Sequence, residues 1–194
     1  MYIINLLLLF IILSLEHIGY ALIWNNPNLI LRRVNNPNKA IDLIEQFLIS
    51  QKIIQIIAII LFMYNFYRLN MLQFSNKIKY TLLIIGIILC ILGQLLNISV
   101  YKTIGRNGVY YGNHFGLSIP WVNTFPYNNK YIKHPQYIGA TFFWIGACLI
   151  VYSFISDKSI IVQNSIILIA IFQIINYYIM SKIEETNISK YKYL

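Results

Sequence analysis

The chain has 194 residues, of which 58% are hydrophobic and only 11% are charged. So much apolar surface excludes a soluble domain of this size, because too few polar residues remain to cover it. The net charge of +9 does not indicate nucleic-acid binding, since no basic cluster is interleaved with a soluble aromatic face, and in a membrane protein a basic excess mainly reports orientation.

Five apolar stretches approach the length of about 20 residues that a membrane-spanning helix needs. In chain order they are Tyr2–Trp24, Ile53–Tyr67, Tyr80–Val100, Tyr137–Ile155 and Ile160–Met180. The second is short unless its flanks join it. The sequence therefore predicts an all-α integral membrane protein with four to five transmembrane or intramembrane helices. We expect a single membrane-embedded domain over residues 1–194, with a functional cytosolic loop between the third and fourth segments.

The first stretch is interrupted by Glu16 and His17. A signal peptide would require a basic start and a small-residue cleavage site, but no Lys or Arg precedes Arg32 and Tyr20–Trp24 is bulky. This favours a retained helix or a re-entrant segment. Ionisable groups at membrane depth indicate function by default. If the stretch enters the bilayer only partway, both side chains lie at the interface without a special role, and the two interpretations stay open.

Basic residues are divided unevenly between the two sides of the predicted bundle. If all five stretches cross, one side holds 11 of the 15 Lys and Arg residues, including Arg106, Lys133 and Lys182. The other side holds Arg68, Lys77, Lys79 and Lys158. Because cytoplasmic loops carry the excess of Lys and Arg, the loop at 105–136 and the C-terminal tail are predicted to lie together in the cytosol. An arrangement with four spans would weaken this count.

The two cysteines, Cys90 and Cys148, lie inside apolar stretches. Neither has the spacing of a metal site or the context of a disulfide, and buried Cys usually packs as a small hydrophobic residue. We expect structural roles for both and no metal site.

A polar and aromatic segment, Gly105–Gly139, separates the third and fourth stretches and reads GRNGVYYGNHFGLSIPWVNTFPYNNKYIKHPQYIG. An ordinary connecting loop is shorter, so this segment indicates a site. Its first glycines, at 105, 108, 112 and 116, follow spacings of three, four and four. On a continuous helix they would form a packing face of the GxxxG type. Alternatively, they expose the backbone to a bulky cofactor.

Two short polar motifs adjoin the last two apolar stretches. His134-Pro135-Gln136-Tyr137 precedes one of them, and its simplest interpretation is a helix start with Pro in the first turn and an interfacial Tyr. Glu184-Glu185 follows the other, where acidic residues oppose the helix dipole. The pair is either a solvated charge balanced by Lys182 or a carboxylate pair that binds hydroxyl or amino groups of a polar ligand.

Taken together, these motifs resemble those of the phosphatidylethanolamine N-methyltransferases, small integral membrane enzymes of phospholipid methylation. The resemblance covers most of the chain from about Trp24 onward. The motifs that carry it are Asn26-Pro27, GRNGVYYGNHFG at 105–116, Phe125-Pro126-Tyr127, Pro135-x-Tyr137-x-Gly139 and Glu184-Glu185.

The resemblance implies S-adenosylmethionine as the methyl donor. The family binds it through a Gly-x-Gly motif in the span before the aromatic loop and through a Glu pair after the last span. The first motif falls on Ile91-Leu92-Gly93, where Gly93 matches and Ile91 stands in place of the first glycine. The second falls on Glu184 and Glu185, which both match. These five residues are the expected cofactor-binding set.

The substrate pocket is expected around Tyr110, Tyr111, Phe115 and Tyr137, whose aromatic faces would stabilise a sulfonium or a methylated ammonium. The attacking nitrogen must be unprotonated, and His114 is the candidate base that accepts its proton. The implied reaction is N-methylation of phosphatidylethanolamine, or of its mono- and dimethyl derivatives, towards phosphatidylcholine. The phospholipid would enter from the bilayer and the cofactor from the cytosol.

The same resemblance implies a location in the endoplasmic reticulum membrane, or in a mitochondrial membrane, as a multi-pass protein. His134-Pro135 also resembles the related isoprenylcysteine carboxyl methyltransferases, which usually continue into a longer tail. Two alternatives therefore stay open. One is an enzyme of that carboxyl methyltransferase type, and the other is a non-catalytic helical membrane subunit whose glycine face packs against a partner.

Overall fold

The structure, a computed structural model, describes residues 2–66, 76–119, 122–129, 131–155 and 160–191. These residues form α-helices and one 3-10 turn, and no strand occurs among them. In chain order the elements are α1 (Tyr2–Asn25), α2 (Asn28–Val34), α3 (Pro37–Phe66), α4 (Asn76–Val109), η1 (Gly112–Phe115), α5 (Pro135–Ile155) and α6 (Ile160–Tyr191). Within the described part, five helices are long and apolar enough to cross a membrane. The expectation of an all-α membrane protein is confirmed.

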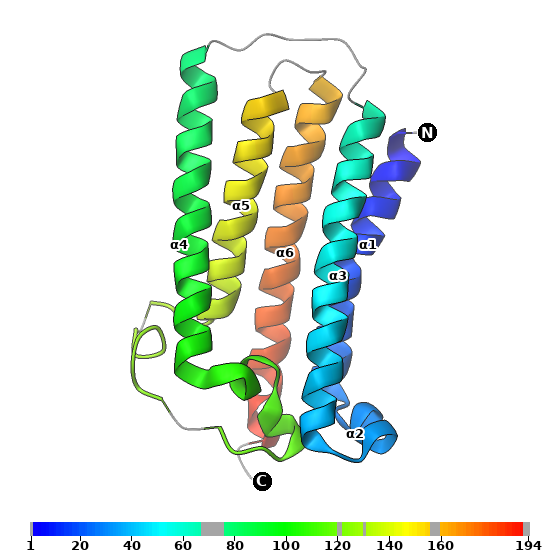
Figure 1. Ribbon diagram of the computed structural model, residues 1–194, viewed down its shortest axis with the longest axis vertical. Helices are drawn as coiled ribbons and strands as arrows, with labels where there is room; N and C mark the ends of the chain where they lie inside the picture. The colour runs from blue at the N-terminus through cyan, green and yellow to red at the C-terminus, as the bar shows by residue number, and fades with distance from the viewer. Residues whose placement is uncertain (1, 67–75, 120–121, 130, 156–159, 192–194) are drawn as a thin grey trace.

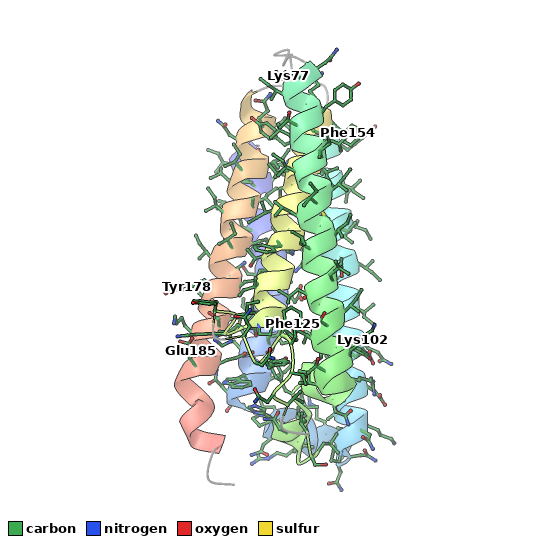
Figure 2. All side chains as sticks on the ribbon, turned by 90° about the vertical axis from the view of Figure 1, so that its left-hand side faces the viewer. Lys77, Lys102, Phe125, Phe154, Tyr178 and Glu185 are labelled. Atoms are coloured by element: carbon green, nitrogen blue, oxygen red, sulfur yellow. The ribbon has the colours of Figure 1, made fainter. Side chains whose placement is uncertain are left out.

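The five long helices form an elongated bundle (Figure 1). Extensive contacts join α4 to α5, α5 to α6, α6 to α1 and α1 to α3. The short helix α2, the segment after α4 and the C-terminal end of α6 gather at one end of the bundle (Figure 1). We call this the loop end. Figure 2 shows Lys102, Phe125 and Glu185 toward that end, whereas Lys77 and Phe154 lie toward the opposite, far end.

The first apolar stretch forms a complete helix of the bundle. Leu9 and Leu13 are buried, and α1 contacts both α3 and α6, so α1 packs as one of the five long helices, and the number of helices that cross the membrane stays a prediction. Glu16 and His17 are also buried, at 3% and 6% exposure. This burial places both side chains inside the bundle, and the choice between a functional role and an interfacial position stays a prediction.

The second stretch begins much earlier than its predicted start at Ile53, because α3 starts at Pro37. Ala40, Ile41, Ile44 and Leu48 are all buried, and their spacing places them on one helical face. Charged residues alternate with them, so the run does not stand out by hydropathy. Three residues of the earlier expectations, namely Tyr67, Arg68 and Lys158, lie outside the described residues.

Glycines bring α4 and α5 into backbone contact along the bundle. A Cβ atom on Gly93 would lie 2.5 Å from the carbonyl oxygen of Gly139, and one on Gly86 would lie 2.8 Å from that of Gly146. Such close approach is the usual function of small residues between membrane helices. Cys90 lies at the same seam, where its Sγ is 3.6 Å from the carbonyl oxygen of Phe143, and Cys148 of α5 packs against a buried cluster from α1, α3 and α6.

Of the two alternatives for the glycines at 105–116, the packing face on a continuous helix is wrong, because those residues do not form one continuous helix. Gly105 has φ 65° and interrupts the helical geometry of α4, a conformation that glycine adopts without steric cost. Gly112 begins the 3-10 turn and Gly116 ends it with φ 83°. The segment instead folds back across the loop end of the bundle.

Candidate functional site

Glu184 is the centre of a polar cluster at the loop end. Its side chain is only 15% exposed. Tyr111 donates a hydrogen bond of 2.6 Å to Glu184 Oε1, and Tyr137 donates to the same oxygen. The two tyrosine hydroxyls are 3.2 Å apart. A buried carboxylate requires such donors, and here they come from the segment after α4 and from the first turn of α5.

Glu185 lies beside Glu184 but in a more open environment, with 34% of its side chain exposed. His134 Nε2 donates to Glu185 Oε1 at 3.1 Å, and Lys182 Nζ lies 2.6 Å from Oε2. His134 Nδ1 is also 4.0 Å from Glu184 Oε2. Because α5 begins at Pro135, His134 stands just outside the helix and its side chain reaches across to α6.

Aromatic rings surround the tyrosine hydroxyls. Tyr20 and Trp24 of α1 pack edge-on against Tyr111, with ring centroids 5.5 and 5.1 Å away. Tyr177 of α6 stands 6.0 Å from Tyr137. Phe115 is 3% exposed and belongs to the same buried cluster as Tyr111. The polar cluster is therefore enclosed by ring faces and edges from four parts of the chain.

The Phe125-Pro126-Tyr127 triplet joins the site from the loop. Thr103 Oγ1 of α4 donates to the carbonyl oxygen of Phe125 at 3.2 Å. Burial, together with the negative charge of Glu184, raises the pKa of Tyr127 to about 12. Both effects disfavour the tyrosinate, so Tyr127 is a neutral hydroxyl in the neighbourhood of the carboxylate.

His114 lies on another side of the aromatic cluster. Its ring centroid is 4.2 Å from that of Trp24 and 5.8 Å from that of Tyr111. It also lines a half-polar pocket of about 410 Å³ at the turn between α1 and α2. The other lining residues of this pocket are Asn25, Asn26, Pro27, Asn28, Leu29 and Arg32. His134, not His114, is the histidine in contact with the Glu pair, and the role of His114 as a base stays a prediction.

The remaining predicted residues are divided between this cluster and the surface. Tyr110 is partly buried and packs against the cluster that contains Tyr111. Ile91 and Leu92 are 53% and 47% exposed on the outside of α4. The backbone of α5 occupies the space beside Gly93. In this structure, helix α5 rather than a ligand makes the close approach that glycine permits at position 93. A cofactor contact at residues 91–93 stays a prediction.

Several residues of the cluster were not anticipated from the sequence. Tyr177 precedes Glu184 by seven residues, which is two helical turns on the same face, so its proximity had a signal in the spacing. Tyr20 and Trp24 had a weaker signal, as aromatics at the end of an apolar stretch. Arg106 pairs with Asp42 at 2.6 Å and with Glu45 at 2.5 Å. This contact fastens the end of α4 to α3, and no local pattern indicated it.

Residues 81–193 match the phospholipid methyltransferase family. A 48-residue segment is 50% identical to a phosphatidyl-N-methylethanolamine N-methyltransferase from Arabidopsis thaliana. That match covers 25% of this chain and 28% of the relative. No solved structure matches the chain. The family match covers more than half of the chain and contains every cluster residue from Tyr111 to Glu185, and it establishes that the chain belongs to the phospholipid methyltransferase family.

Proposed function

We propose that the protein is an enzyme that transfers methyl groups from S-adenosylmethionine to the amine of phosphatidylethanolamine, or of its mono- and dimethyl derivatives, towards phosphatidylcholine. The proposal treats residues 1–194 as one membrane-embedded domain. It rests above all on one observation, the convergence of Tyr111, Tyr137 and His134 on the Glu184-Glu185 pair. The name of the similar plant protein, which specifies a methylated phosphatidylethanolamine as substrate, also supports it.

The chemistry of the cluster fits this cofactor. Carboxylates accept hydrogen bonds from amino and hydroxyl groups, and Glu184 and Glu185 would hold the polar groups of S-adenosylmethionine. Aromatic faces attract cations, and the rings of Tyr20, Tyr111 and Tyr137 surround the buried carboxylate. When bound, the cofactor supplies an electrophilic methyl group on a sulfonium. The two Tyr hydroxyls orient the Glu184 carboxylate, and His134 and Lys182 orient that of Glu185.

Positioning supplies much of the acceleration in such a transfer, because the amine must approach the methyl group in line. The amine must also lose a proton to a nearby base or to water. His114 is the base predicted from the sequence, and His134 is the histidine held 3.1 Å from Glu185. Comparing His114→Asn with His134→Asn in one assay separates a proton acceptor from a residue that holds the Glu pair. Loss of the acceptor lowers kcat, whereas loss of His134 raises the KM for the cofactor.

The decisive experiment incubates membranes that contain the protein with S-adenosylmethionine labelled in the methyl group. Label in phosphatidylcholine or in its monomethyl and dimethyl precursors is the expected result. Label found only in base-labile methyl esters would support the alternative of an isoprenylcysteine carboxyl methyltransferase-like enzyme and contradict the proposal. The lipid precursors that carry label would also identify which of the three methylations occur.

The alternative of a non-catalytic helical subunit is tested by Glu184→Gln combined with Glu185→Gln. The proposed enzyme loses cofactor binding while it still inserts in the membrane, whereas a subunit keeps its function. Asp42→Asn is the control, because Asp42 is a half-exposed carboxylate that pairs with Arg106 at the same end of the bundle, whereas Tyr111 and Tyr137 donate to Glu184. The proposal also includes a location in endoplasmic reticulum or mitochondrial membranes, which microscopy of the tagged protein tests.

A further inference from the structure

A pocket of about 540 Å³ lies inside the bundle, between the loop end and the far end. This size falls within the range of about 300–1,000 Å³ that is common for ligand pockets. Helices α3 and α5 supply most of its lining, and residues of α1, α4 and α6 form the remainder. The full set is Glu16, Lys52, Gln55, Ile56, Ile59, Ile60, Met63, Gln94, Asn97, Ala140, Phe143, Trp144, Ala147, Cys148, Val151, Ile166, Ile169 and Tyr177.

The polar lining residues lie toward the loop end of this pocket, and apolar residues line the part toward the far end. Helix α3 runs away from the loop end (Figure 1), so Lys52 and Gln55 precede Ile59 and Met63 along the wall. Helix α6 runs in the opposite direction, and there Ile166 and Ile169 come before Tyr177 (Figure 1). The pocket is therefore amphiphilic along the axis of the bundle, in the same sense as one leaflet of a bilayer.

Both signs of charge are present at the polar end. Glu16 is 3% exposed, hydrogen-bonds to Gln55 and lies within electrostatic range of Lys52. Asn97 also lines this end of the pocket, and its Oδ1 lies against Gly139 of α5. Charged residues at membrane depth are costly and usually serve a substrate path or a binding site. A cation and an anion that line the same end of one pocket match the phosphate and the amine of a zwitterionic headgroup.

Tyr177 connects this pocket to the site at the loop end. It lines the pocket and also a surface groove of about 360 Å³ that includes His134 and Tyr137. Its ring is 6.0 Å from that of Tyr137, whose hydroxyl donates to Glu184. A headgroup at the polar end of the pocket would therefore lie on the other side of Tyr177 from the Glu pair.

We propose that this pocket binds one ethanolamine phospholipid, with its phosphate at Lys52, its amine at Glu16 and one acyl chain along the apolar lining of α3 and α5. The inference rests on the proposed function and specifies where its lipid substrate binds. A purely structural alternative would treat Glu16 and Gln55 as polar contacts that join α1 to α3.

Trp144 lines the pocket and provides a readout that needs neither methyl donor nor turnover. The full chain is purified in detergent and titrated with phosphatidylethanolamine brominated on its acyl chains, which quenches nearby tryptophan emission. The quenching lost in Trp144→Phe defines the signal of the pocket. We expect this signal to saturate, and Lys52→Gln to shift the midpoint about 10-fold or more, because hydrogen bonds to charged groups are the stronger ones.

Lys102→Gln is the matched control, since Lys102 is exposed on α4 at the loop end (Figure 2) and does not line the pocket. Brominated phosphatidylglycerol, which has no amine, should bind more weakly than phosphatidylethanolamine to the wild type, and Glu16→Gln should remove that preference. Lys52 is exposed on α3, so Lys52→Gln tests the proposal even where Glu16→Gln fails to fold.

Quenching that rises linearly with lipid, or a midpoint that is the same in Lys52→Gln and Lys102→Gln, would overturn the proposal. Equal binding of the two lipids would overturn the assignment of Glu16 to the amine. The proposed function fails separately: saturable binding together with no transfer of label from S-adenosylmethionine would leave a lipid-binding protein that does not methylate.

Discussion

Tyr137 contributes one hydroxyl group to the candidate site, and that group bonds to a carboxylate that has little access to water. We expect Tyr137→Phe to weaken the binding of S-adenosylmethionine about 10-fold or more, because a hydrogen bond to a charged group contributes about 1.5–3 kcal/mol and holds the carboxylate in one orientation. Isothermal titration of the purified protein measures the affinity. Tyr80→Phe is the control, because Tyr80 is 65% exposed on α4 near the far end. Equal affinities in the two variants would contradict a role for Glu184 in cofactor binding.

Tyr127 gives a prediction about alkaline pH. Its pKa is raised to about 12 in the folded protein, first by burial and then by Glu184, against about 10 in an unfolded chain. The unfolded chain therefore releases this proton at lower pH than the folded one. The stabilising effect is complete below pH 10 and is lost as pH rises towards 12. Thermal melts of wild type and Tyr127→Phe should differ by a constant amount up to about pH 10, and above it the wild type should lose more stability. If the melting temperatures of the two proteins change in parallel above pH 10, the Tyr127 hydroxyl is solvated and the prediction is contradicted.

At the scale of whole helices, the seam between α4 and α5 depends on glycine. A methyl group at position 93 would lie 2.5 Å from the carbonyl oxygen of Gly139, so Gly93→Ala should push the helices apart at a cost of about 1–3 kcal/mol. We expect a lower melting temperature in detergent. Ile91→Ala is the control, because Ile91 is exposed two residues earlier on the same helix and exposed substitutions usually change stability by about 0.5 kcal/mol or less. An unchanged melting temperature in Gly93→Ala, with cofactor binding lost, would favour the ligand role of this glycine over packing.

The sequence predicted those elements that a local run of residues or a short motif identifies. Long apolar runs identify membrane helices because the bilayer sets their length, and the Gly, His-Pro and Glu-Glu motifs pointed to the segments that the structure brings together at the loop end. The start of α3 was missed, since Ala40, Ile41 and Ile44 alternate with charged residues. The placement of Tyr20 against Tyr111 was missed for a different reason. It depends on the order in which helices pack, and no local pattern contains that order.

The two ends of the whole molecule differ in charge. The described basic residues at or toward the loop end include Arg32, Lys39, Lys102 and Lys133, whereas Lys77 and Lys79 begin α4 at the far end. Because Lys and Arg accumulate on the cytoplasmic side, the loop end and its Glu pair are expected to face the cytosol. A water-soluble methyl donor would then reach the site from the compartment in which it is made, while lipid approaches through the bilayer.

This orientation is testable with single cysteines. Cys90 and Cys148 are first replaced by Ala, which leaves no thiol in the chain, and Lys39→Cys, Lys77→Cys and Lys102→Cys are then made separately. In sealed vesicles with the cytosolic face outward, a membrane-impermeant maleimide should label positions 39 and 102 at once and position 77 only after detergent is added. One crossing by α4 separates 77 from 102, and two crossings, by α3 and α4, return 102 to the side of 39. Labelling of 77 together with 102 would therefore exclude α4 as a span, whereas labelling of 77 alone would keep the five-helix bundle and place the Glu pair on the opposite face of the membrane.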